Sequence, residues 1–175
     1  MSAGRARPRI AVTLGDPRGI GPEVTFAALA DGETAASAEF VLVCPESLCR
    51  PGSDDVAVGR WVPEDGAAAA GRIAGEAIRR GTEMAMAGRV DALVTAPIDK
   101  AAFHDGGWDF PGHTEMLRDL AGVADVGMMM AAERTALGGA LRVVLATTHI
   151  ALRDVPGALS ADLIVRQAGL AHRSL

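Results

Sequence analysis

Short apolar runs, rich in β-branched residues, recur along this 175-residue chain, and several of them stop at a glycine or a proline. Runs of this length and composition, bounded by turn residues, are typical of buried strands. The pattern predicts strands over 9–14, 40–44, 90–95, 126–131 and 141–147, with one further short strand inside 50–65.

Segments of helical character separate most of these strands. The pattern predicts helices over 22–30, over the Ala-rich segment 67–88, from Gly112 onward, and over 160–175 with Ser160 as its N-cap. Glycines interrupt the helical spacing within 67–88, and glycine disfavours a helix interior. Strands that alternate with helices predict an α/β fold: a mainly parallel sheet with helices on both faces and right-handed crossovers.

Composition narrows the class of protein. The chain is 49% hydrophobic and 22% charged, with a net charge of -5 and no long run of one sign. These values fit a globular domain and disfavour disordered, collagen-like and membrane-spanning classes, so we expect neither a membrane nor a nucleic acid as partner. The first ten residues lack the apolar stretch of a secretory signal, which predicts a cytoplasmic protein with Cys44 and Cys49 as reduced thiols.

Residues that directly follow strands are the first candidates for a binding site, because ligands of parallel sheets bind beyond the carboxyl ends of the strands. Asp16 follows the first predicted strand within the segment 15–23, whose glycines are spaced G-x-x-x-G-x-G. This spacing differs from the G-x-G-x-x-G of a Rossmann phosphate turn. Gly21 before Pro22 marks a helix start with amides facing the crevice, although the glycines could equally serve the turn alone.

Two further candidates lie after the strand predicted over 90–95. Lys100 can meet a phosphate or a carboxylate as a point charge, although most lysines are simply solvated. His113 and Thr114 open a helix, where an imidazole, a hydroxyl and unpaired amides suit an anionic substrate. The alternative for this pair is a helix start with an incidental histidine.

His149 follows the strand predicted over 141–147, where a neutral imidazole is a good ligand for a divalent metal ion. One histidine does not make a metal site, so at least two further ligands are required. The final helix pattern stops at Leu175 without a cap, which predicts a chain cut inside an element, although a natural helix can also end abruptly.

Four blocks together carry a resemblance to a known family: LGDPRGIGPE, LVTAPIDKAAF, FPGHTEML and MMMAAERTALGGALRVVLATTHIALRDVP. In this order they resemble the 4-hydroxythreonine-4-phosphate dehydrogenase family of pyridoxal phosphate biosynthesis. The resemblance implies an isopropylmalate/isocitrate dehydrogenase-like fold, here incomplete, in a two-lobed homodimer. It places residues 1–108 in the N-terminal part of the first lobe and 109–175 at the start of the second. It also implies NAD binding without the Rossmann glycines.

The resemblance implies a role for each candidate residue. His113 and Thr114 match a substrate-binding pair, His149 matches the first of three metal-binding histidines for Zn, Mg or Co, and Lys100 and Asp16 receive substrate-crevice roles. No residue is assigned as the catalytic acid or base. The implied reaction is oxidation of 4-phosphooxy-L-threonine by NAD, assisted by the metal ion and followed by decarboxylation.

Three alternatives stay open at this point. The substrate could instead be 4-phospho-D-threonate or 4-phospho-D-erythronate, since those dehydrogenases resemble the same four blocks. The other two histidine blocks of the family are absent from this chain, as are the residues that help hold the phosphorylated substrate. We therefore expect the chain alone to be inactive, and it could be a truncated, non-catalytic α/β module.

Overall fold

The computed structural model describes residues 7–136 and 138–174 and divides the chain into two compact units. The first unit spans Met1–Gly122 and the second Val123–Leu175. The boundary between the two units therefore lies between residues 122 and 123. The boundary predicted between residues 108 and 109 is a different one: it separates the two lobes of the complete protein, and it stays a prediction. Within the described ranges, no helix has both the length and the apolar character needed to cross a membrane.

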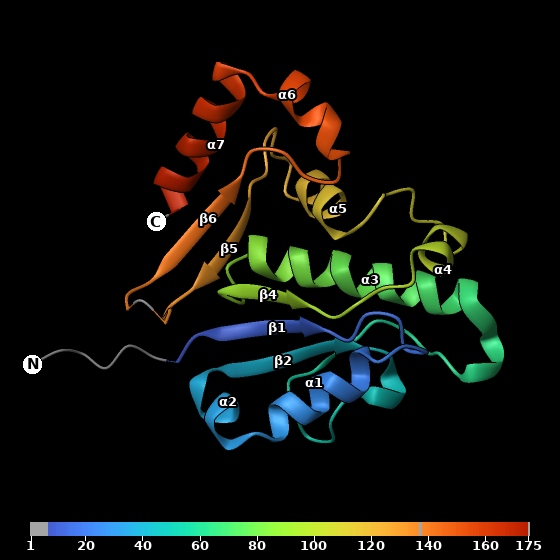
Figure 1. Ribbon diagram of the computed structural model, residues 1–175. Coiled ribbons are helices and arrows are strands. Elements are labelled where there is room, and N and C mark those ends of the chain that lie inside the picture. The colour runs from blue at the N-terminus through green and yellow to red at the C-terminus, as the bar shows by residue number, and fades with distance from the viewer. Residues whose placement is uncertain (1–6, 137, 175) are drawn as a thin grey trace, which may run out of the picture. The chain divides into compact units, whose positions relative to one another are not determined.

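A four-stranded parallel sheet forms the centre of the first unit (Figure 1). Its strands are β1 (Arg9–Thr13), β2 (Glu39–Cys44), β3 (Val56–Ala57) and β4 (Ala92–Thr95), in the order β3-β2-β1-β4. Every neighbouring pair is parallel, with Thr13 opposite Val43 on one side and Thr95 on the other. The predicted parallel α/β sheet is confirmed for this unit, and its carboxyl edge is the edge where the site residues are expected.

Helices cover both faces of this sheet, as predicted (Figure 1). On one face, Ala11, Val41 and Val43 pack against α3 (Gly66–Met86). On the other face, Val12 and Leu42 pack in a cluster with side chains of α1 (Gly21–Ala30), which is followed by the short α2 (Gly32–Ser37). Successive strand residues point to opposite faces, so the continuous apolar runs of β1 and β2 serve both layers.

The glycines inside α3 have a packing reason. A Cβ added at Gly71 would lie 1.8 Å from the carbonyl oxygen of Ala102, and one added at Gly75 would lie 2.1 Å from Nε1 of Trp108. These positions let α4 (Lys100–Asp105) and the segment after it lie directly against α3. The intrinsic cost of glycine in a helix is therefore offset by close packing.

The same side of α3 also holds α5 (His113–Leu120). Ile78 of α3, Phe103 of α4 and Met116 of α5 are at most 1% exposed and form one cluster. This cluster fixes the start of α5 relative to the end of β4. Two short 3-10 turns, η1 (Glu46–Leu48) and η2 (Pro63–Asp65), complete the connections of the first unit.

The second unit corrects one prediction. Its strands β5 (Met128–Ala132) and β6 (Leu141–Leu145) pair antiparallel in a separate two-stranded sheet, whereas the alternation rule assigned every strand to one mainly parallel sheet. The physical reason is the short connection 133–140: a parallel crossover needs a dozen or more residues. After η3 (Leu152–Asp154) and α6 (Val155–Ala158), the last helix is α7 (Ala161–Ser174), and the hydroxyl of Ser160 accepts from the Leu163 amide as predicted.

Candidate functional site

Two loops meet at the carboxyl edge of β1 and β4. The backbone amide of Asp16, after β1, donates to the carbonyl oxygen of Pro97, after β4, at 3.0 Å. Gly15 has a φ of +69°, and a Cβ there would lie 2.0 Å from that same oxygen. Glycine is therefore required for this crossing of two backbones, which supports the turn interpretation of the glycines in this segment.

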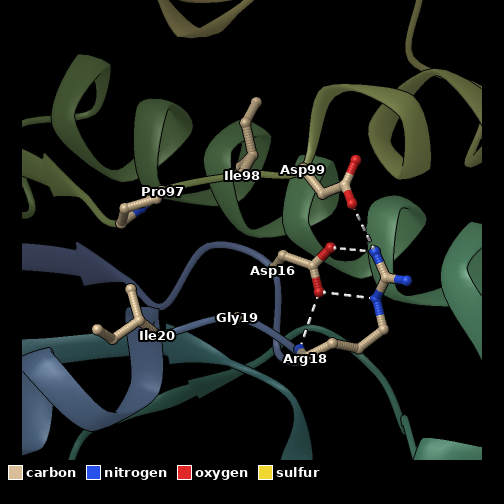
Figure 2. Close-up of a pocket in the computed structure, with 7 residues that line it drawn as sticks. All are labelled: Asp16, Arg18, Gly19, Ile20, Pro97, Ile98 and Asp99. Atoms are coloured by element: carbon tan, nitrogen blue, oxygen red, sulfur yellow. Dashed lines mark hydrogen bonds and ion pairs between the residues drawn. The ribbon is translucent and has the colours of Figure 1, made fainter.

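Asp16 is almost fully buried and is paired with Arg18 (Figure 2). The Nε and Nη2 atoms of Arg18 donate to the two carboxylate oxygens of Asp16 at 3.1 and 2.7 Å, and the Arg18 backbone amide donates at 2.8 Å. This bidentate pair raises the pKa of Arg18 above its ordinary value, chiefly through the hydrogen bond to Asp16. Asp16 therefore holds a guanidinium rather than an open coordination position.

The guanidinium of Arg18 also links this loop to Asp99. Its Nη2 donates to Asp99 at 3.2 Å, and Asp99 caps α4 by accepting from the amides of Ala101 and Ala102. The bond from the Ala102 amide is the main reason that the pKa of Asp99 lies below its ordinary value. Sequence analysis did not identify Arg18, although an arginine two residues after an aspartate in a glycine-rich turn was a usable signal.

These residues line a pocket of about 460 Å³ (Figure 2). Its walls come from both loops: Asp16, Arg18, Gly19, Ile20, Pro97, Ile98 and Asp99. Two carboxylates flank a single guanidinium, so the charge of Arg18 is already neutralised within the pocket. For this reason an anionic group is expected to bind not at Arg18 but at Lys100, His113 and Thr114, which lie further along the same edge.

His113 begins α5 and lies half-buried beside the end of β4. Burial lowers the pKa of His113, while its hydrogen bond to the backbone of Ala96 acts in the opposite direction. Its Nε2 atom is buried and has no hydrogen-bond partner in the described part of the chain. A neutral imidazole fixed by Ala96 therefore keeps one nitrogen available to a ligand that reaches it.

Lys100 and Thr114 lie at the same corner of the first unit. A Cβ added at Gly112, directly before His113, would lie 4.0 Å from Cε of Lys100, whose side chain is exposed. Thr114 is half-buried in the first turn of α5. Asp16, Lys100, His113 and Thr114 thus lie around the segment that follows β4. Together they provide the cation of Lys100, the hydroxyl of Thr114 and the backbone amides at the start of α5.

His149 belongs to the second unit and is described separately from these four residues. It is exposed, and its φ of +57° makes it the one non-glycine residue with a positive φ in the described part of the chain. Histidine occupies this left-handed region at an energetic cost, and such conformations concentrate at functional sites.

The family resemblance implies two cofactors, NAD and a divalent metal ion, and the described residues do not form a complete site for either. Residues 7–136 and 138–174 contain no group of three or more His, Cys, Asp or Glu side chains that could hold a metal ion. Gly15 and Gly21 do not leave an open cradle for a dinucleotide, because a Cβ at either would lie 2.0 Å from a backbone carbonyl oxygen of this chain. The described residues by themselves therefore complete a site for neither group.

The fold and the loops define an α/β protein with its ligand-binding candidates at the carboxyl edge of a parallel sheet. Sequence comparison specifies the family. Residues 23–175 match the family described as pyridoxal phosphate biosynthetic protein PdxA, and the chain belongs to this family. The resemblance carried by the four blocks is thereby confirmed.

Curated relatives and solved structures agree with this membership. The 4-hydroxythreonine-4-phosphate dehydrogenase of Synechococcus sp. (strain JA-3-3Ab) is 35% identical over 191 residues, which cover 96% of this chain and 55% of the relative. The D-threonate 4-phosphate dehydrogenase of Pectobacterium atrosepticum is 31% identical, covering 93% and 60%. A crystal structure of the 4-hydroxythreonine-4-phosphate dehydrogenase of Klebsiella pneumoniae aligns with a TM-score of 0.79 at 32% identity, covering 95% and 58%. The chain spans little more than half the length of these proteins.

Proposed function

We propose that this chain supplies part of the substrate site of an NAD-dependent, divalent-metal-assisted dehydrogenase. The proposed reaction is oxidation of the secondary alcohol of 4-phosphooxy-L-threonine, followed by decarboxylation, in pyridoxal phosphate biosynthesis. The observation that carries the proposal is the gathering of Lys100, His113 and Thr114 at one corner of the carboxyl edge, within a chain of this family.

The proposed roles follow from the chemistry of each side chain. The ammonium group of Lys100 and the amides at the start of α5 attract an anionic group of the substrate. The hydroxyl of Thr114 and the unpartnered Nε2 of His113 orient the substrate through hydrogen bonds. Asp16 acts indirectly, because its carboxylate is occupied by Arg18 and so holds the wall of the neighbouring pocket.

His149 is proposed as one ligand of a Zn, Mg or Co ion. A divalent ion lowers the pKa of a bound hydroxyl and stabilises developing negative charge. One imidazole does not retain such an ion, and the described residues offer no further cluster, so the other ligands must come from elsewhere in a complete, homodimeric protein. The strained backbone of His149 supports a functional rather than a packing role.

There are two alternatives to this proposed function. The Pectobacterium relative carries the name of a D-threonate 4-phosphate dehydrogenase, which favours 4-phospho-D-threonate, or the related D-erythronate ester, as alternative substrate. A non-catalytic α/β module is the second candidate, because residues 7–136 and 138–174 contain no group of three or more side chains that could hold a metal ion.

The deciding experiment measures NADH formation by this chain with each phosphorylated substrate, first alone and then co-expressed with the remaining half of the Synechococcus relative. We expect no turnover from the chain alone and metal-dependent turnover from the pair, lost in His149→Ala and weakened at the level of KM in Lys100→Ala. Turnover by the chain alone would contradict the shortage of metal ligands. An inactive but folded pair would favour the non-catalytic module.

A further inference from the structure

Two cysteines that the proposed function does not use lie in contact in the first unit. Cys44 is the last residue of β2, and Cys49 follows the 3-10 turn η1. Their Sγ atoms are 3.2 Å apart, and both thiols are free. A disulfide has an S–S distance of about 2.05 Å, so the sulfurs need to approach by only about 1 Å.

The backbone between the two cysteines is held by its own hydrogen bonds. The Leu48 amide donates to the Pro45 carbonyl at 2.9 Å, and the Cys49 amide donates to the Glu46 carbonyl at 3.3 Å. The Glu46 amide donates to the carbonyl of Gly59, across the neighbouring loop, at 3.0 Å. The contact between the thiols is therefore a property of an ordered turn at the carboxyl edge of the sheet.

The two thiols differ sharply in access to solvent. Cys44 is fully buried in the core cluster that contains Leu14 and Leu42, whereas Cys49 is partly exposed at the rim of the same cluster. Burial, reinforced by the neighbouring Cys49 thiol, raises the pKa of Cys44 above its ordinary value. An external reagent can reach Cys49 first, and Cys44 is placed to attack Sγ of Cys49 once Cys49 carries a mixed disulfide.

We propose that Cys44 and Cys49 form a reversible intramolecular disulfide by exchange with a low-molecular-weight disulfide. In the first step the Cys49 thiolate attacks one sulfur of the small disulfide, forms a mixed disulfide and releases one small thiol. In the second step the Cys44 thiolate attacks Sγ of Cys49, forms the Cys44–Cys49 bond and releases the second small thiol. Two protein thiols are oxidised, the small disulfide is reduced to two thiols, and the two protons pass to the products.

Oxidation closes a short loop next to a second buried ion pair. Arg50, which follows Cys49, donates to Asp55 through its backbone amide and its side chain, and Asp55 also accepts from the amide of Leu42 in β2. A bond between Cys44 and Cys49 would fix this turn to the end of β2. For a loop of this size we expect the Tm of the first unit to rise by about 5 °C.

The test uses the native chain and oxidised glutathione. After reaction, the chain is unfolded in the presence of an alkylating reagent that blocks the remaining thiols, and a protease that cleaves after glutamate cuts at Glu46, between the two cysteines. We expect peptides 40–46 and 47–64 to remain joined until a reductant is added, with the mass of the pair lower by two hydrogens. Persistence of glutathione on Cys49, alkylation of both cysteines, or a link between two chains would overturn the proposal.

Single variants test the order of the two steps. Cys44→Ser removes the resolving thiol, so we expect Cys49 to retain one glutathione. Cys49→Ser leaves only the buried thiol, so we expect no uptake in the native protein and full uptake after unfolding in urea. Uptake by native Cys49→Ser at the rate of the unfolded chain would show that Cys44 is accessible and would refute the proposed sequence of steps.

Discussion

Replacing Asp55 with asparagine removes a buried charge that joins three segments of the first unit. The Asp55 side chain is 1% exposed and accepts hydrogen bonds from the amides of Leu42 and Arg50 and from the Arg50 guanidinium, the latter at 2.7 and 2.9 Å. Burial by itself raises the pKa of Asp55, but these bonds outweigh it and lower the pKa to about 2. The carboxylate is therefore more stable in the folded chain than in the unfolded one.

The size of the effect follows from this pKa. Each pKa unit corresponds to about 1.4 kcal/mol, so lowering the pKa from 3.8 to about 2 contributes about 2.5 kcal/mol to the free energy of unfolding. Because the folded pKa is the lower one, this contribution is complete well above pH 4 and disappears as the pH falls toward 2. Asp55→Asn should therefore cost about 2–3 kcal/mol at pH 7, including the unpaired Arg50 donors, and progressively less in acid.

Urea unfolding followed by tryptophan fluorescence measures this cost in the first unit, because both tryptophans of the chain, Trp61 and Trp108, lie there. We expect the midpoint of Asp55→Asn to fall by roughly 1–2 M at pH 7. Asp54→Asn is the matched control: Asp54 pairs with Arg9 at 2.7 Å but is 81% exposed, so it should cost less than about 1 kcal/mol. Equal costs for the two variants at pH 7, or a cost for Asp55→Asn that is independent of pH, would refute the reasoning.

Three further substitutions test the carboxyl edge and the second unit. Arg18→Met leaves the Asp16 carboxylate buried without its cation and should cost about 2–3 kcal/mol in the same urea assay, whereas Arg80→Met, whose partner is exposed, should cost less than about 1 kcal/mol. Gly21→Ala places a Cβ 2.0 Å from the Leu14 carbonyl oxygen and should cost at least about 3 kcal/mol by the same measurement. His149→Val should lower stability by about 1–2 kcal/mol in thermal unfolding followed by circular dichroism, and His149→Gly by less than about 0.5 kcal/mol.

Each of these expectations has an outcome that contradicts it. Equal stability of the Arg18 and Arg80 variants would mean that water replaces the guanidinium at Asp16. A Gly21→Ala protein as stable as Gly32→Ala, where a Cβ meets nothing within 4 Å, would mean that the start of α1 moves away from the Leu14 carbonyl at little cost. A His149→Val protein that matches His149→Gly in stability would mean that the backbone at this position is not strained.

The sequence predicted β1 and β2 because each is a continuous apolar run that packs against helices on both faces. It predicted α3 despite the interrupting glycines, whose reason is the contact with Ala102 and Trp108. The pairing of β5 with β6 was predicted wrongly, because apolar character marks a strand but not the direction of its neighbour. The length of the connection 133–140, which is too short for a parallel crossover, carries that information.

Lys100, His113 and Thr114 were predicted as candidate residues because they directly follow a strand or begin a helix. Arg18 was missed although its bidentate partner, Asp16, lies only two residues away; its further bond to Asp99, 81 positions away, could be seen only in the tertiary structure. The substrate-binding roles of Asp16, Lys100, His113 and Thr114 and the metal-ligand role of His149 stay predictions.

Local chemistry was sufficient for what the sequence determined alone: the α/β class, the family motifs, the helix starts and the residues that face the carboxyl edge. Tertiary structure decided which charges meet, which glycines permit two backbones to cross, and which of two cysteines is shielded from solvent. The physical reason is that periodicity and turn chemistry act between neighbours in the chain. Burial and ion pairing depend on distances that exist only once remote segments have packed together.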